Sequence, residues 1–192
     1  MPLSIIHPAL EAASLEEDDD LQDTWANLLA NAADVRQPDV MSPSFPLILK
    51  ELGAREVKFL DVLYQHAEDQ VKDVKFRRLL DRRFLGSHKQ RLGIPQEHKI
   101  GLVRFHYSEM ESLYAKSVLG IRERRPTKKL DALSRTFDFS LDLVKRNRLL
   151  DEVFGLTPPE REGQPDRNGA ICRFSFLGAR FVAACRAPVK AK

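Results

Sequence analysis

The sequence lacks long apolar runs and clustered glycines, and it has little cysteine; each shortage excludes a class of protein. Its longest apolar runs are only a few residues, far short of the roughly 20 that cross a lipid bilayer as a helix. No basic region precedes an apolar core at the N-terminus, so we expect no signal peptide. These absences predict a cytoplasmic protein without a membrane span.

The two cysteines stand apart from any metal-binding or redox motif. Cys172 and Cys185 form no Cys-x-x-Cys pair, and three histidines have no ligand-like spacing with them: His88, His98 and His106. We therefore expect two reduced, buried thiols. No phosphate-binding loop is predicted, because the glycines are isolated: Gly53, Gly86 and Gly93. The sequence thus predicts no catalytic residue, no cofactor, no metal site and no enzyme.

What is present describes an ordinary globular chain. It has 192 residues, 43% of them hydrophobic, and a mean hydropathy of -0.36. These values are typical of a folded protein and not of a disordered one. The length suits one medium domain or two small ones that share a core.

Charge is distributed unevenly along the chain. Residues 1–34 contain eight acids and no Lys or Arg, whereas residues 72–129 contain sixteen Lys and Arg against six acids. Two interpretations stay open: the basic middle binds nucleic acid, or the acidic end of one protomer docks on the basic middle of another. The acids from Asp18 to Asp23 lack the alternating ligands and the glycine turn of a calcium loop, so we interpret them as a solvated helix start.

Apolar residues at helical spacing predict four helices in the first 70 residues. The clearest is an amphipathic helix over residues 18–33, whose apolar side is formed by Leu21, Trp25, Leu28, Leu29 and Ala32. A shorter helix precedes it and either begins after Pro8 or contains Pro8 near its start; its apolar residues are Ile5, Ile6, Ala9, Leu10 and Ala13. Helices over residues 44–52 and 54–68 then form a hairpin around Gly53.

The middle of the chain is its least regular part. Residues 71–84 carry a charged helical pattern, and residues 86–99 resemble a loop. Residues 100–119 predict a helix whose first part is alternatively a short strand. Residues 120–129 are interpreted as a charged linker.

The last third predicts a helix followed by a β-hairpin. Residues 130–147 have one apolar helical face, and residues 149–154 and 171–176 are typical of strands. A turn-rich loop over residues 155–169 separates the strands, and a helix over residues 177–185 closes the chain. Helix, strand, long loop and strand is the layout of a recognition helix with a wing.

We therefore predict a mainly α fold, in which a helical N-terminal region packs on a winged-helix-like C-terminal module with a small β-hairpin. The expected segments are a helical region over residues 1–70, a basic segment over residues 71–129, the recognition-helix-plus-wing module over residues 130–187 and a tail over residues 188–192.

Basic residues around the predicted recognition helix favour nucleic-acid binding as one function, because clustered Lys and Arg neutralise phosphates. The candidates are Arg124, Arg125, Lys128, Lys129, Lys145, Arg146 and Arg148. Against this, we expect three aspartates on the exposed face of the same helix, where they would repel phosphate: Asp131, Asp138 and Asp142. The basic residues at the C-terminal end of this helix also interact favourably with the helix dipole, which explains their position without any ligand.

A second candidate site lies on the helix over residues 18–33. Asn27 and Asn31 are four residues apart on one helix face, where their amides and Trp25 suit the binding of a protein partner. In the alternative interpretation, the amides tie down the loop that follows the helix, while Trp25 packs in the core.

The same helix carries a family resemblance. The chain resembles the abortive infection alpha family, a bacterial family linked to phage defence, in ALEAASLEED over residues 9–18 and WANLLANA over residues 25–32. The family's Pro-Ser-Phe and following helix are matched by residues 43–45 and 48–52. Residues 174–185 resemble its C-terminal strand and helix.

The resemblance implies a non-catalytic, cytosolic component of phage defence that binds a protein partner or itself. The alternative is a winged-helix regulator that binds nucleic acid. Ser42 stands where the family usually has a histidine. Longer relatives also carry an N-terminal extension, partly helical and partly hydrophobic, so we expect any activity seated in that extension to be missing here.

Overall fold

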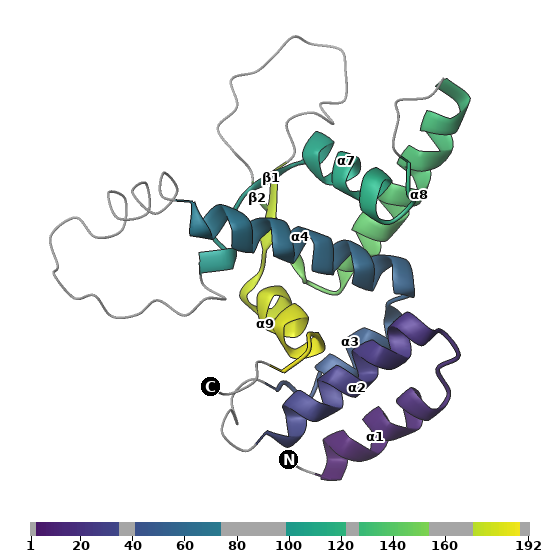
Figure 1. Ribbon diagram of the computed structural model, residues 1–192, viewed down its shortest axis with the longest axis vertical. Helices are drawn as coiled ribbons and strands as arrows, with labels where there is room; N and C mark the ends of the chain where they lie inside the picture. Colours follow the sequence, from purple (N-terminus) through teal and green to yellow (C-terminus); the bar gives the residue numbers. More distant parts are fainter. Residues whose placement is uncertain (1–2, 35–40, 74–98, 122–126, 154–170, 189–192) are drawn as a thin grey trace, which may run out of the picture.

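A computed structural model gives the arrangement of helices and strands over residues 3–34, 41–73, 99–121, 127–153 and 171–188 (Figure 1). Within these ranges the helices are α1 (Leu3–Ser14), α2 (Asp19–Ala33), α3 (Phe45–Glu51), α4 (Ala54–Lys72), α7 (Tyr107–Ser117), α8 (Thr127–Arg146) and α9 (Phe176–Cys185). The strands are β1 (Phe105–His106), β2 (Leu150–Val153) and β3 (Ile171–Phe174).

The N-terminal helices form where the apolar spacing predicts them. α2 begins after Asp18, whose carboxylate accepts a hydrogen bond from the backbone N–H of Leu21 at 3.1 Å. This cap satisfies one of the N–H groups that a helix start leaves unpaired. All four predicted helices are confirmed, and α4 continues four residues beyond its predicted end, to Lys72.

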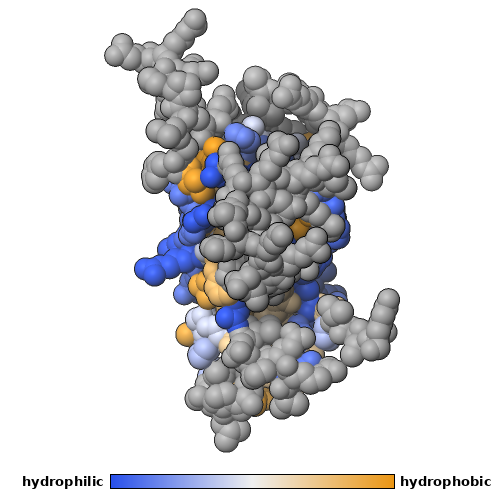
Figure 2. Space-filling model, turned by 90° about the vertical axis from the view of Figure 1, so that its left-hand side faces the viewer, coloured by the Kyte–Doolittle hydropathy of each residue, from blue (hydrophilic) through white to orange (hydrophobic). Residues whose placement is uncertain are grey.

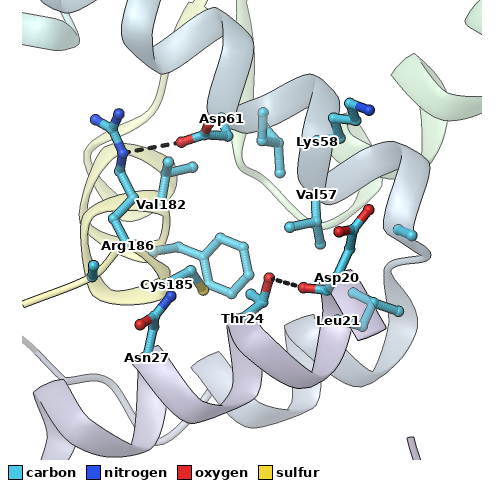
Figure 3. A pocket seen from close by; sticks show the side chains of 14 residues that line it. Asp20, Leu21, Thr24, Asn27, Val57, Lys58, Asp61, Val182, Cys185 and Arg186 are labelled. Atoms are coloured by element: carbon cyan, nitrogen blue, oxygen red, sulfur yellow. Dashed lines mark hydrogen bonds and ion pairs between the residues drawn. The ribbon is translucent and has the colours of Figure 1, made fainter. Parts of the chain in front are cut away.

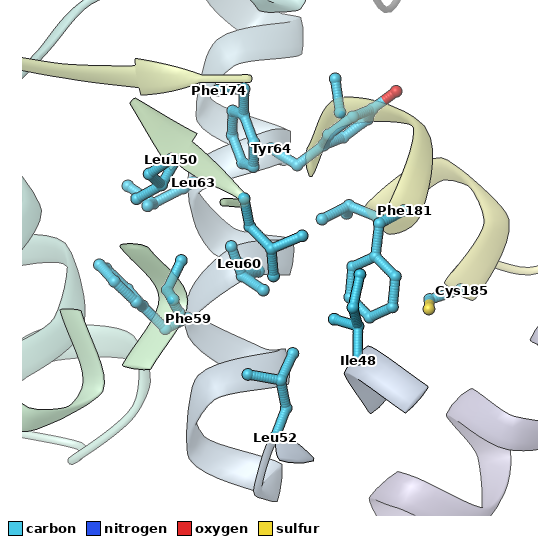
Figure 4. Packing of buried hydrophobic residues seen from close by; sticks show 14 of the residues in the cluster. Ile48, Leu52, Phe59, Leu60, Leu63, Tyr64, Leu150, Phe174, Phe181 and Cys185 are labelled. Atoms are coloured by element: carbon cyan, nitrogen blue, oxygen red, sulfur yellow. The ribbon is translucent and has the colours of Figure 1, made fainter. Parts of the chain in front are cut away.

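α4 is the central helix of the fold. α1, α2, α3 and α9 lie on one side of it, and α7 and α8 lie on the other (Figure 1). Phe59 of α4 is fully buried. Its ring packs edge-to-face against Tyr114 of α7 and Phe137 of α8, with centroid distances of 5.3 and 5.7 Å. Figure 4 shows how the apolar side of α4 joins the core residues of the other elements.

The sheet has three antiparallel strands in the order β1-β3-β2. β2 and β3 form the predicted hairpin, with Leu150 opposite Phe174 and Val153 opposite Ile171. β1 adds a third strand through the pairing of Phe105 with Cys172. β1 lies in residues 100–119, for which the sequence predicts a helix whose first part is alternatively a short strand. The prediction of a mainly helical fold with a small sheet is confirmed in coarse outline.

A buried chain of hydrogen bonds links α4, α7 and α8. The Ser140 hydroxyl donates to the Glu56 carboxylate at 2.5 Å and lies 3.1 Å from the hydroxyl of Tyr114. The second Glu56 oxygen accepts the backbone N–H of Gly53 at 3.1 Å. Because a buried carboxylate without partners is strongly unfavourable, these contacts fix how the three helices meet.

The structure changes one prediction for the middle of the chain. The linker expected over residues 120–129 is wrong in its second half, because α8 already begins at Thr127. Lysine is a good helix former, and a first helical turn needs no apolar residue, so Lys128 and Lys129 extend the helix. Of the charged helix expected over residues 71–84, the first two residues belong to α4. Residues 74–98, which include most of that helix and of the loop expected over residues 86–99, lie outside the described residues.

One hydrophobic cluster runs through the described residues. It contains residues of all three large predicted segments, and α9 near the C-terminus packs closely on α2 near the N-terminus. On the face shown in Figure 2, small hydrophobic areas lie scattered among hydrophilic ones.

Candidate functional site

The structure separates the three side chains of the predicted cluster on α2. Trp25 lies in the core, with an exposed fraction of 2%. Its indole N–H has no hydrogen-bond partner among the described residues. Burial leaves the ring no surface with which to meet another molecule, so its contribution is to packing.

Asn31 joins α2 to the end of α9. Its side-chain amide donates one hydrogen bond to the carbonyl oxygen of Ala184 and another to that of Arg186, both at 2.8 Å. Carbonyls at a helix C-terminus have no partner within the helix, and Asn31 supplies that partner across the core. Its amide therefore holds two ends of the chain together.

Replacing Asn31 by Ala is expected to lower the free energy of unfolding by about 1–3 kcal/mol, because two half-buried carbonyls lose their donor. Urea or thermal unfolding measures the loss. Asn27→Ala is the matched control: the side chain of Asn27 makes no hydrogen bond in the described structure, so we expect a change within about 0.5 kcal/mol. Equal losses in the two variants would contradict the assigned role of Asn31.

Asn27 instead lines a pocket of about 420 Å³ between α2, α4 and α9 (Figure 3). The apolar part of the lining comes from all three helices: Leu21, Val57, Leu60, Phe181 and Val182. Charged residues of both signs also line it: Asp20, Lys58, Asp61 and Arg186. The pocket is therefore amphipathic, without a dominant charge.

Arg186 closes one end of this pocket by binding α4. Its guanidinium lies 3.0 Å from a carboxylate oxygen of Asp61 and 2.9 Å from one of Glu68. It also donates to Gln65 at 2.6 Å and stacks 5.1 Å above the ring centroid of Tyr64. With its charge held by α4, Arg186 anchors the chain after α9 instead of presenting a free cation.

Both cysteines are free and buried, as predicted. Burial raises the pKa of the Cys185 thiol, which lines the pocket. Burial also raises the pKa of Cys172, while the nearby Lys145 acts in the opposite direction. Both groups are therefore protonated thiols, which are poor nucleophiles. Among the residues that the structure describes, no three His, Cys, Asp or Glu side chains gather to hold a metal ion.

The basic candidates around α8 are spread over different environments. Lys145 lies 3.2 Å from a carboxylate oxygen of Glu152, and Arg146 is 3.9 Å from Glu51 with 70% of its side chain exposed. Arg124 and Arg125 lie outside the described residues. Lys128 and Lys129 lie in the first turn of α8, where only the backbone is described.

The expectation of three exposed aspartates on α8 is wrong for Asp138. This side chain is half-buried and accepts a hydrogen bond from the hydroxyl of Tyr107, because α7 packs against that side of α8. Asp142 is exposed, as expected. The side chain of Asp131 lies outside the described residues.

Four exposed residues form one stripe along α8: Arg135, Phe139, Asp142 and Arg146. Their spacing of four, three and four residues keeps them on one side of the helix. We call this stripe the α8 face. Phe139 at its middle has an exposed fraction of 70%, whereas Phe137 and Val144 on the opposite side are fully buried.

Sequence reasoning missed Phe139, although the sequence held a signal. Phe137 and Phe139 are two residues apart, so a helix places them on nearly opposite sides. Helical spacing places Phe137 on one apolar face with Leu133, Leu141 and Val144, so Phe139 has to face away from it.

Arg148 follows α8 in an unusual backbone conformation. Its φ is 56°, in the left-handed region that favours glycine. Its N–H donates to the carbonyl of Lys145 at 2.8 Å, and the N–H of Leu149 donates to the carbonyl of Val144 at 3.1 Å. These two bonds define a Schellman motif, whose left-handed position is usually occupied by glycine.

Arg148→Gly is therefore expected to raise the free energy of unfolding by about 1 kcal/mol, because glycine removes the left-handed strain. In a chain of this size that corresponds to roughly 2–4 °C in melting temperature. Arg148→Ala keeps the strain and removes the charge, so it separates the two effects. A Gly variant no more stable than the Ala variant would show that Arg148 is unstrained.

A comparison with family sequence profiles identifies the chain. The profile of abortive infection alpha matches residues 1–185. The chain belongs to the abortive infection alpha family. The match includes the basic middle segment, which the resemblance from individual motifs did not reach. Comparisons with curated proteins and with solved structures gave no match.

Membership of the abortive infection alpha family indicates a part in abortive-infection phage defence. In this abortive infection alpha protein, no helix of the described ranges is long and apolar enough to cross a membrane. The described surface features are the amphipathic pocket at α2, α4 and α9, and the α8 face.

Proposed function

We propose that this abortive infection alpha protein is a non-catalytic, cytoplasmic component of phage defence that acts by binding protein through the α8 face. The observation that carries the proposal is Phe139, an aromatic ring that is 70% exposed in the middle of a stripe of charged side chains.

The composition of the α8 face suits a protein partner. Burying a Phe side chain is worth about 1.5–3 kcal/mol, so a partner that covers Phe139 gains affinity from one residue. Aromatic residues and Arg are enriched in protein interfaces and in their energetic centres. Charges of both signs beside the ring add selectivity for a complementary surface.

The connectivity around α8 supports a winged-helix-like module. In the order of the described elements, α4 is followed by β1, by the helices α7 and α8, and by the pair β2 and β3, of which β3 also pairs with β1. In that layout α8 occupies the position of the recognition helix. We infer that it serves as a docking platform here, because the acidic Asp142 lies on its exposed face and the charge of Lys145 is paired with Glu152.

The alternative, a regulator that binds nucleic acid, differs in a measurable way. Contacts between Lys or Arg and phosphates release counterions, so affinity for nucleic acid falls steeply with salt. We expect titrations with duplex DNA and with RNA to show no binding at low or high salt. Binding with a steep salt dependence would favour the alternative.

A phage challenge of bacteria with and without the intact gene tests the defence role itself. We expect fewer plaques on cells that carry the gene, at equal growth before infection. Equal phage sensitivity of the two strains across a phage panel would contradict the proposed function.

A further inference from the structure

The charges of the α8 face are arranged symmetrically about Phe139. Arg135 lies four residues before the ring, and Asp142 lies three residues after it. An antiparallel copy of the same helix, related by a two-fold axis near Phe139, brings Asp142 of the second copy opposite Arg135. The symmetry then brings Arg135 of the second copy opposite Asp142, as in any isologous interface.

From this complementarity we infer that the protein bound by the α8 face is a second copy of the chain. The two α8 helices pair antiparallel, with the two Phe139 rings at the axis and an Arg135–Asp142 ion pair on each side. The inference deepens the proposed function and rests on it, because it names the partner of the same surface.

Helix direction distinguishes this arrangement from its alternative. In a parallel pair, Arg135 meets Arg135 and Asp142 meets Asp142, and like charges across an interface disfavour association. Only the antiparallel pair is complementary. The same two-fold axis brings position 131 of one α8 opposite position 146 of the other. These positions also carry opposite charges, since they are Asp131 and Arg146.

The central rings complete the interface. Phe139 has little contact in the single chain, with 70% of its surface exposed, and paired aromatic rings attract each other beyond the area they bury. One helix face is smaller than the roughly 1,200–2,000 Å² of a stable interface. We therefore expect a weak dimer whose population rises with protein concentration.

Charge reversal with sedimentation velocity tests the pairing. Arg135→Asp and Asp142→Arg each place like charges opposite one another, so we expect each variant to be monomeric at concentrations where the wild type dimerises. The double variant restores both ion pairs and is expected to dimerise. An equimolar mixture of the two single variants is expected to form a heterodimer, because each supplies the charges that the other lacks.

Controls keep the result independent of folding. Circular dichroism and melting temperature check that each variant is folded, which we expect because both positions are exposed. Arg55→Asp reverses a charge at an exposed position of α4 and is expected to leave dimerisation unchanged. Single variants that dimerise like the wild type, or a mixture that stays monomeric, would overturn the antiparallel pair.

The outcomes also separate this inference from the proposed function. A wild type that stays monomeric up to millimolar concentration, yet protects cells and loses protection on Phe139→Asp, overturns the second copy and leaves another protein as partner. If the variants dimerise as expected but the wild type does not protect cells against phage, the proposed function is overturned and the antiparallel pair still stands.

Discussion

Gly178→Ala is expected to lower the free energy of unfolding by about 3 kcal/mol or more, enough to leave little folded protein in a marginally stable chain. A Cβ atom at this position would lie 2.0 Å from the backbone oxygen of Leu149. That oxygen also accepts the N–H of Ser175 at 3.1 Å, and the Ser175 hydroxyl donates to the carbonyl of Arg148 at 2.5 Å. Because these hydrogen bonds hold the backbone around Leu149 and the start of α9 together, neither segment can move away to make room for a Cβ atom.

Gly120→Ala is the control for this variant. Gly120 has a φ of 67°, but nothing among the described residues lies within 4 Å of the point that a Cβ atom would occupy there. Its replacement is expected to cost about 1–2 kcal/mol through backbone strain alone. Urea unfolding of both variants measures the difference. A Gly178 variant as stable as the Gly120 variant would mean that α9 does not approach Leu149 so closely.

Phe59→Ala is expected to lower the free energy of unfolding by about 3–5 kcal/mol, because it opens a cavity at the centre of the core. Phe59 is fully buried on α4 between Tyr114 and Phe137. Its removal therefore loosens the contacts of α4 with both α7 and α8.

Phe139→Ala is the matched control, since it removes the same ring from a position that is 70% exposed. We expect a change within about 0.5 kcal/mol when unfolding is measured at low protein concentration. Similar losses in the two variants would contradict either the burial of Phe59 or the exposure of Phe139.

The helices and the hairpin were predictable because their signals are local. The apolar spacing of α2 defines its buried side from its own sequence, and alternation predicts the strand β3 in the same way. The predicted strand, over residues 171–176, is two residues too long, because Ser175 caps α9 and Phe176 begins it. The third strand was not settled from sequence. β1 has two residues, Phe105 and His106, and so short a strand exists only because β3 lies beside it.

Contacts between distant residues were beyond sequence reasoning. Glu56 and Ser140 are 84 residues apart, and neither has a local pattern that indicates their hydrogen bond. The left-handed conformation of Arg148 is equally invisible, because glycine is the usual residue at that position. Asp138 was misplaced because the packing of α7 decides which side of α8 is exposed.

The candidate sites show the same division. Helical spacing correctly placed Asn27 and Asn31 on one side of α2, but only the fold shows that Asn31 binds the end of α9 and Asn27 lines a pocket. Trp25 shares their sequence neighbourhood and yet lies in the core. Phe139 was predictable in principle, since its exposure follows from the burial of Phe137.

A plaque assay on cells that express Phe139→Asp tests the central claim most directly. Leu47→Asp is the control, because Leu47 is also an exposed apolar residue, at 62%, and lies on α3 outside the α8 face. At equal soluble expression, we predict that Phe139→Asp abolishes protection against phage and that Leu47→Asp keeps it. Full protection by Phe139→Asp would contradict the assignment of the α8 face as the functional surface.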